Sequence, residues 1–198
     1  MLEALQQLDT ELFLWINGHH CTGMDWPMWV LSQHWFFVAV LVIAFFALTT
    51  QSFHLSPFTF HLERRWWLLL LAIGLCFLLA DQGSVQLFKN TVCRLRPCHA
   101  IEDVYMFRTG CGGRYGFVSS HAANAFALIV FLSMCRRRTL FTLLMCLWGV
   151  AICYSRVYLG KHYPGDVVCG AFFGAVIGLV VWKIYNWIEK KFALCETK

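Results

Sequence analysis

The sequence predicts an all-α integral membrane protein, a helical bundle of about five transmembrane helices with an N-terminal interfacial amphipathic helix. Hydrophobic residues occupy 59% of the 198 positions and charged residues only 14%, a charge content well below that of soluble domains. Several apolar runs reach the roughly 20 residues with which a helix crosses a bilayer. The mean hydropathy of +0.60 agrees with this class. We expect a single domain over residues 1–198.

Residues 1–20 are predicted to lie on the membrane surface. Apolar side chains at three- and four-residue spacing form one face of a helix that ends at Asn17-Gly18: Leu2, Leu5, Leu8, Leu12 and Ile16. This helix is too short and too polar to span, so an interfacial helix is expected. A helix packed as in soluble proteins is the alternative, and a re-entrant segment would make six spans. Glu3 and Asp9, without a basic stretch, argue against a cleavable signal peptide.

Five apolar runs are predicted to cross the membrane. They cover about residues 26–48, 66–88, 119–135, 140–154 and 166–187. The first run contains Gln33 and His34 as polar exceptions. In the last run glycine recurs every four residues, at Gly170, Gly174 and Gly178, and this spacing predicts close helix packing in lipid.

Basic residues set the expected orientation. In a five-span bundle three clusters fall on one side, which the positive-inside rule makes cytoplasmic: Arg64-Arg65, Arg136 to Arg138 and Lys190-Lys191. The net charge of +5 is therefore assigned to cytoplasmic loops and anionic headgroups, and nucleic acid is not expected as a partner. Loop 89–118 and the stretch 155–165 share the outer face. Loop 89–118 is itself basic, against the rule, so its charges are expected to have another role.

Eight of the 10 cysteines fall into two groups. Five lie in or beside apolar runs, where a free thiol behaves as a small buried apolar group: Cys76, Cys135, Cys146, Cys153 and Cys169. Cys93, Cys98 and Cys111 instead cluster in the outer loop. In an oxidising compartment two of them could form a disulfide, and with His99 a zinc site is conceivable, although the spacing matches no established zinc pattern.

Three polar segments are expected to meet on the outer face: KNTVCRLRP at 89–97, VSSHAAN at 118–124 and SRVYLGKHYPGD at 155–166. Each alone has an ordinary explanation, namely snorkelling basic residues, a helix-capping Ser119, or a loop histidine before a helix-start acid. Together they supply cations for phosphate oxygens, a helix N-terminus that favours anions, two histidines and a carboxylate. This combination predicts phosphoryl transfer, in which one histidine attacks phosphorus and the other protonates the leaving oxygen.

The three segments resemble the signature motifs of the type 2 phosphatidic acid phosphatase superfamily, K-x6-R-P, P-S-G-H and S-R-x5-H-x3-D. The first and third match at every fixed position, whereas the second has Val118 for proline and Ser120 for glycine. The resemblance implies that His162 is a nucleophile that forms a phosphohistidine, with Asp166 orienting it and His121 as general acid and later base. It also implies metal-free phosphate binding, without a cofactor, by Lys89, Arg96, Ser119, Arg156 and the Ser120 amide. The added Ser120 side chain is expected to narrow the pocket.

This site suits a membrane lipid, whose phosphate lies at headgroup depth while its tail stays in hydrocarbon. A small chain with an outward site resembles undecaprenyl diphosphate phosphatases, which recycle a cell-wall carrier lipid. The resemblance implies metal-independent hydrolysis of a lipid phosphate or diphosphate monoester in the bacterial inner membrane, with the site facing the periplasm or exterior. Lipid A, phosphatidylglycerol phosphate and phosphatidate are alternative substrates. A non-catalytic lipid-phosphate binding or transport protein is the alternative function.

Two polar residues inside spans need separate interpretations. Asp81 is a candidate site residue because acids within spans are usually functional, or else it packs against Gln82 or Gln86 through a hydrogen bond. His34 lacks the matched histidine that a heme or quinone protein would need, and hydrogen-bonded packing is the simpler interpretation.

Overall fold

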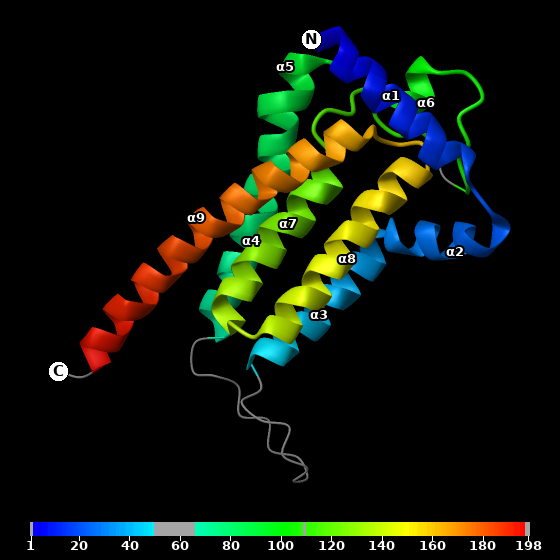
Figure 1. Cartoon of the computed structure of the whole chain (residues 1–198). Coiled ribbons are helices and arrows are strands. Elements are labelled where there is room, and N and C mark those ends of the chain that lie inside the picture. Colours follow the sequence, from blue (N-terminus) through cyan, green and yellow to red (C-terminus); the bar gives the residue numbers. More distant parts are fainter. Residues whose placement is uncertain (1, 50–65, 109, 197–198) are drawn as a thin grey trace.

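A computed structural model describes residues 2–49, 66–108 and 110–196 of the chain (Figure 1). The elements are α1 (Leu2–Gly18), α2 (Thr22–Leu31), α3 (His34–Thr49), α4 (Trp66–Gly83), the π-helical η1 (Ser84–Lys89), α5 (Asn90–Val92), α6 (Pro97–Ala100), α7 (Ser120–Arg136), α8 (Thr139–Tyr158) and α9 (Pro164–Glu196). No element of this described part is a strand, and a single isolated bridge joins Leu95 to Tyr115. The predicted all-α bundle is confirmed.

Three helical stretches of the described chain are long and apolar enough to cross a bilayer: Trp66–Val92, Thr139–Tyr158 and Pro164–Phe192. α2 and α3 together make a further, bent crossing, and α7 is apolar but shorter. α7 occupies the centre, where it packs against α9, α4 and α8 (Figure 1). The described residues thus contain three crossings, or four with the bent pair, and the predicted fifth crossing corresponds to the shorter α7.

The first predicted span, residues 26–48, is wrong as a continuous helix. The chain breaks at Ser32 and Gln33, and α2 meets α3 at an angle of 63°. Ser32 is buried at the break, and its Oγ accepts a hydrogen bond from Nη1 of Arg156 on α8. Gln33 Nε2 turns back to the carbonyl of Trp29 at 3.2 Å. Polar partners at this depth therefore stabilise a corner that the hydropathy profile does not show.

The other helix ends differ from prediction in a way that matters for the site. α8 continues to Tyr158, so Ser155 and Arg156 lie in its last turns and not in a loop. Of the five cysteines predicted to be buried, Cys76 is buried, whereas Cys135, Cys146 and Cys153 are partly buried and Cys169 is exposed on α9. The residues 50–65, with Arg64 and Arg65, lie outside the described residues.

α1 lies across the end of the bundle that carries α6, over the start of α9 and the end of α8 (Figure 1). Phe13 is fully buried beneath it and meets the ring of Tyr163 edge to face, with ring centroids 5.5 Å apart. The opposite face of α1 leaves large apolar side chains exposed: Leu5, Leu8, Leu12, Leu14 and Trp15. An exposed apolar face is what an interfacial helix presents to lipid.

The glycine repeat of α9 forms a seam against α7. A Cβ atom added at Gly170, Gly174 or Gly178 would meet a backbone carbonyl oxygen of residues 119, 123 or 127 at 2.6, 2.0 or 2.2 Å, respectively. The two backbones approach so closely that no side chain fits between them. The close packing predicted from the glycine spacing is therefore confirmed.

Replacing Gly174 by alanine should lower the free energy of unfolding by about 3 kcal/mol, because the added methyl group overlaps the carbonyl of Ala123 and the backbone cannot retreat. Gly74 on α4 is a matched control, since a Cβ there meets nothing within 4 Å. Thermal unfolding of the two purified variants in detergent measures the difference. Equal melting temperatures for both would contradict the seam.

Candidate functional site

A cavity of about 240 Å³ lies at the α6 end of the bundle, between helices that are distant in the sequence. Its wall consists of His34, Phe37, Phe77, Asp81, Val85, Lys89, Arg96, Ser120, His121, Asn124, Arg156 and His162. All residues that the three motifs predict line this cavity except Ser119 and Asp166, which lie behind the wall. The structure therefore brings the three motifs together around one space.

His162 lies in the cavity wall, and Asp166 lies directly behind it. They are 1% and 0% exposed, and Nδ1 of His162 lies 3.5 Å from Oδ2 of Asp166, at ion-pair distance but without a formed hydrogen bond. Burial, with the guanidinium groups of Arg96 and Arg156 nearby, lowers the pKa of His162 well below its usual value. At neutral pH the imidazole is therefore uncharged and retains a lone pair for nucleophilic attack.

Asp166 is held by a network that the sequence did not reveal. Its Oδ1 accepts a hydrogen bond from Nη1 of Arg94 at 3.0 Å, and Nη2 of the same guanidinium lies 2.8 Å from Oδ2 of Asp9 on α1. The guanidinium also lies 4.0 Å from the ring centroid of Tyr163. Asp9 Oδ1 in turn accepts from the N–H of Gly165 at 2.7 Å, at the start of α9. The basic excess of loop 89–118 was the only sign that Arg94 had such a role.

Lys89 enters the cavity from the end of η1, a π-helical turn of the kind often found at functional sites. Its ammonium donates to Ser120 Oγ at 2.7 Å, which lies 2.6 Å from Ser84 Oγ, and Ser84 donates to the carbonyl of Asp81 at 2.7 Å. The Ser120 hydroxyl, which replaces the glycine of the motif, thus ties α7 to η1. It also forms part of the cavity wall.

Ser119 does not cap α7 with its side chain, so that alternative is wrong. Its backbone N–H donates to the carbonyl of Asp166 at 3.0 Å, while its fully buried Oγ has no hydrogen-bond partner among the described residues. This backbone contact joins the second motif directly to the third.

His121 faces a second histidine that sequence reasoning left as packing. The ring centroids of His34 and His121 are 5.1 Å apart, and both rings line the cavity. His34 is brought there by the corner between α2 and α3, which a continuous first span would not have produced. Within the described ranges, no three His, Cys, Asp or Glu side chains are arranged to hold a metal ion.

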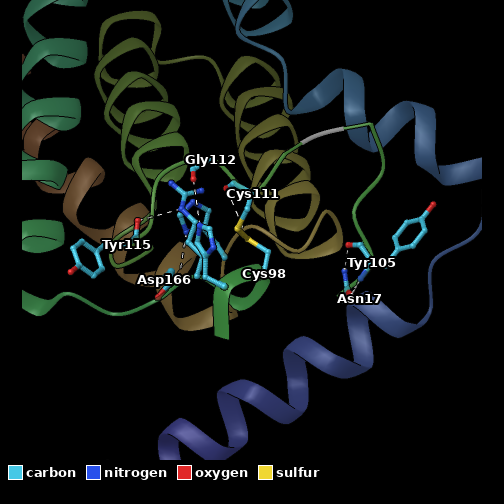
Figure 2. The surroundings of a disulfide bond; sticks show 10 residues. Asn17, Cys98, Tyr105, Cys111, Gly112, Tyr115 and Asp166 are labelled. Carbon is cyan, nitrogen blue, oxygen red and sulfur yellow. Dashed lines mark hydrogen bonds and ion pairs between the residues drawn. A yellow bond between two sulfur atoms is a disulfide. The ribbon is translucent and has the colours of Figure 1, made fainter. Parts of the chain in front are cut away.

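Figure 2 shows how the loop beside the cavity is fixed. Cys98 and Cys111 form a disulfide, which decides the pairing that the sequence left open. Arg96 donates from Nε to the carbonyl of Tyr115 at 3.3 Å. The buried Asn17 of α1 holds the far side of the loop, where its amide donates to the Tyr105 carbonyl and accepts from the Tyr105 N–H, each at 3.0 Å. The loop that carries Arg96 is therefore held covalently and by α1.

Known proteins similar to this chain are membrane phosphatases. A family model described as the PAP2 superfamily matches residues 65–190. A lipid A 4'-phosphatase from Bacteroides thetaiotaomicron is 34% identical over 189 residues, which cover 93% of this chain and 79% of the relative. A lipid A 4'-phosphatase from Porphyromonas gingivalis is 29% identical over 198 residues, with 96% and 78% covered. A decaprenylphosphoryl-5-phosphoribose phosphatase from Mycolicibacterium smegmatis is 36% identical over 108 residues, 54% of each chain.

Two crystal structures share the fold. Aquifex aeolicus LpxE matches with a TM-score of 0.63 at 23% identity, over 89% of this chain and 95% of that chain. The first transmembrane PAP2 type phosphatidylglycerolphosphate phosphatase from Bacillus subtilis matches with a TM-score of 0.63 at 19% identity, over 95% and 87%. At these identities the likeness concerns the fold alone.

Proposed function

This chain belongs to the PAP2 superfamily and is a lipid phosphatase embedded in the membrane, and on that premise we propose that it removes a phosphate monoester from a sugar of a glycolipid, with the 4'-phosphate of lipid A as the best candidate. Two relatives that cover nearly the whole chain are named for that reaction. A third is named for a phosphate on ribose, which is also a sugar phosphate. Undecaprenyl diphosphate, which the sequence favours, becomes the comparison substrate.

In the proposed mechanism His162 is the nucleophile. Its imidazole nitrogen attacks phosphorus while the ester bond between phosphorus and the lipid oxygen breaks, and His121 donates a proton to that oxygen. The products are the lipid alcohol and a phosphohistidine. His121 then takes a proton from a water molecule, which attacks the phosphohistidine and releases inorganic phosphate. Asp166 orients the His162 ring and stabilises its positive charge.

The observation that carries this proposal is the convergence of cations on the space between the two histidines. Lys89, Arg96 and Arg156 come from η1, from the residue before α6 and from α8, respectively, and all three line the cavity with His121 and His162. Guanidinium groups bind phosphate oxygens through paired hydrogen bonds, and the charges stabilise the transition state in a site shielded from water. We assign the Ser120 amide to the same anion, at the N-terminus of α7.

The proposed location is a bacterial inner membrane with the site facing the periplasm or exterior. The Cys98–Cys111 disulfide supports this orientation, because disulfides persist in oxidising compartments and this one lies beside the cavity. The basic cluster Arg136 to Arg138 supports it too, because it joins α7 to α8 at the opposite end of the bundle from α6 (Figure 1).

A substrate panel tests the function. Purified protein with EDTA present is assayed for phosphate release from lipid A, undecaprenyl diphosphate, phosphatidylglycerol phosphate and phosphatidate. The highest kcat/KM is expected for lipid A, with loss of the 4'-phosphate identified by mass spectrometry. A preference for any other lipid would overturn the substrate assignment, and loss of activity in EDTA would overturn the metal-free mechanism.

The proposed nucleophile should stay uncharged in mildly acidic solution. Burial and the nearby guanidinium groups lower the pKa of His162 well below its usual value of about 6.5. The imidazole should therefore remain neutral, with its lone pair free to attack, as the pH falls through that value. Histidine 13C NMR in detergent micelles, with the signal assigned by His162→Gln, checks this directly. A His162 signal that titrates near pH 6.5 would contradict the shift.

A further inference from the structure

The cavity continues beyond the proposed phosphate site toward the interior of the bundle. Asn124 lies one turn deeper along α7 than His121, and Asp81 lies about two turns before Lys89 on α4. Both line the cavity together with His34, and the aromatic rings of Phe37 and Phe77 form the wall beyond them. Three zones thus follow one another, first cationic, then polar with two acceptor side chains, and finally apolar.

The middle zone contains the side-chain oxygens of Asp81 and Asn124, which receive few or no hydrogen bonds from the described residues. Asn124 is only 6% exposed, yet its Oδ1 has no hydrogen-bond partner among the described residues. Asp81 accepts from Nδ2 of Asn124 at 3.5 Å and from Nε2 of Gln82 at 3.4 Å, both long contacts, and no described residue forms an ion pair with it. A buried acceptor without a donor is unfavourable, so Asn124 Oδ1 is suited to a donor that a ligand brings. The two long contacts of the half-buried Asp81 leave its carboxylate lone pairs for further donors.

The position of these oxygens relative to His121 indicates which part of a ligand they meet. In the proposed mechanism His121 protonates the ester oxygen that leaves phosphorus, so the atoms attached to that oxygen extend past His121. The next wall residue along α7 is Asn124, with Asp81 opposite it on α4. The group that carries the leaving oxygen therefore contacts the acceptor pair.

We infer that Asp81 and Asn124 form a subsite that accepts hydrogen bonds from hydroxyl or amide groups of the leaving alcohol, and that it selects sugar phosphates over lipid diphosphates. This inference rests on the proposed function and names its specificity determinants. A sugar places donors on the carbons next to the phosphorylated one. The leaving group of a lipid diphosphate is instead a second phosphate, which offers acceptors and negative charge to a carboxylate. Asp81 and Asn124 thus bind the leaving group of a sugar phosphate, whereas the Asp81 carboxylate repels the leaving phosphate of a lipid diphosphate.

The test is the effect of Asp81→Asn on two substrates, lipid A and undecaprenyl diphosphate, measured as kcat/KM with the purified full-length protein. The substitution keeps the size of the side chain and removes its charge. We expect kcat/KM to fall about 10-fold on lipid A, mainly through KM, because a hydrogen bond to a charged acceptor is lost. On undecaprenyl diphosphate we expect an equal or higher value, because the repulsion is removed. Equal losses on both substrates, or no change on either, would overturn the subsite.

Two further variants keep the outcome interpretable. Asn124→Leu is nearly isosteric and removes the unpartnered oxygen, so it should also lose activity selectively on lipid A. Asp103→Asn makes the same charge change at an exposed position of the loop and should change neither rate. If wild-type protein prefers another lipid, the proposed function fails, yet the subsite is still tested by comparing phosphatidylglycerol phosphate, whose glycerol carries a hydroxyl, with undecaprenyl diphosphate.

Discussion

Replacing His162 by alanine is expected to lower kcat for phosphate release by at least about 10³-fold, because members of a catalytic unit that act together are strongly non-additive. No other imidazole of the cavity wall lies beside a buried carboxylate. His121 and His34 face each other at 5.1 Å between ring centroids, and neither forms an ion pair with Asp166 as His162 does. Neither can therefore replace the nucleophile without rearranging the wall. Initial rates of phosphate release from lipid A measure the loss.

Trapping the intermediate gives a second measurement. Wild-type protein quenched in base during turnover of 32P-labelled lipid should retain acid-labile label on histidine, and His162→Ala should retain none. His99→Ala is the control, because His99 is exposed on α6 and does not line the cavity. If His162→Ala leaves the function of the protein unchanged although no phosphohistidine forms, the alternative of a non-catalytic lipid-phosphate binding protein is favoured.

The second large effect is expected at Arg94, which does not touch the cavity. Arg94→Gln should lower kcat by about 10²-fold while leaving KM nearly unchanged. The fully buried Asp166 loses its ion-pair partner, and breaking such a pair leaves an uncompensated charge that costs about 3–5 kcal/mol. Among the described residues, Asp166 then keeps only the N–H of Tyr163 as a hydrogen-bond donor, which holds its orientation toward His162 less firmly. Steady-state kinetics on lipid A separate the two constants.

The matched control for Arg94 is Arg114→Gln, since Arg114 belongs to the same basic loop but is exposed. Arg94→Lys should recover only part of kcat, because one ammonium group cannot bridge Asp9 and Asp166 as the two guanidinium nitrogens do. The pH dependence of kcat should also shift in Arg94→Gln, which a purely structural defect would not produce. A change in KM as large as the change in kcat, together with a large fall in melting temperature, would contradict the positioning role of Arg94.

Residue spacing within the three motifs was sufficient to predict half of the residues in the cavity wall. Lys89 and Arg96 of the first motif line the cavity, and His162, two residues before α9, approaches Asp166 in the first turn of that helix. Hydropathy likewise predicted the helices because each span must be apolar over its length. These features depend on local sequence, so one sequence suffices to find them.

The parts that were missed depend on contacts between distant segments. Asp9 reaches Arg94, and Ser32 reaches Arg156, only because of how α1 and α2 cross the end of α8 and α9. Hydropathy reports the depth of a residue in the membrane and says nothing about such crossing angles. The Cys98 pairing was undecided for the same reason, since the backbone bridge between Leu95 and Tyr115 is what brings Cys111 within reach.

Because α7 and α9 touch backbone to backbone along Gly170, Gly174 and Gly178, their separation cannot change without unfolding the enzyme. His121 lies on α7 and Asp166, which contacts His162, lies on α9, so this seam fixes the spacing between the proposed acid and the carboxylate behind the nucleophile. α3 and α4 carry no such constraint at His34 or Asp81. Substitutions at the cavity residues of α3 and α4 can therefore change which lipid is preferred. The residues proposed to carry out the reaction stay in place.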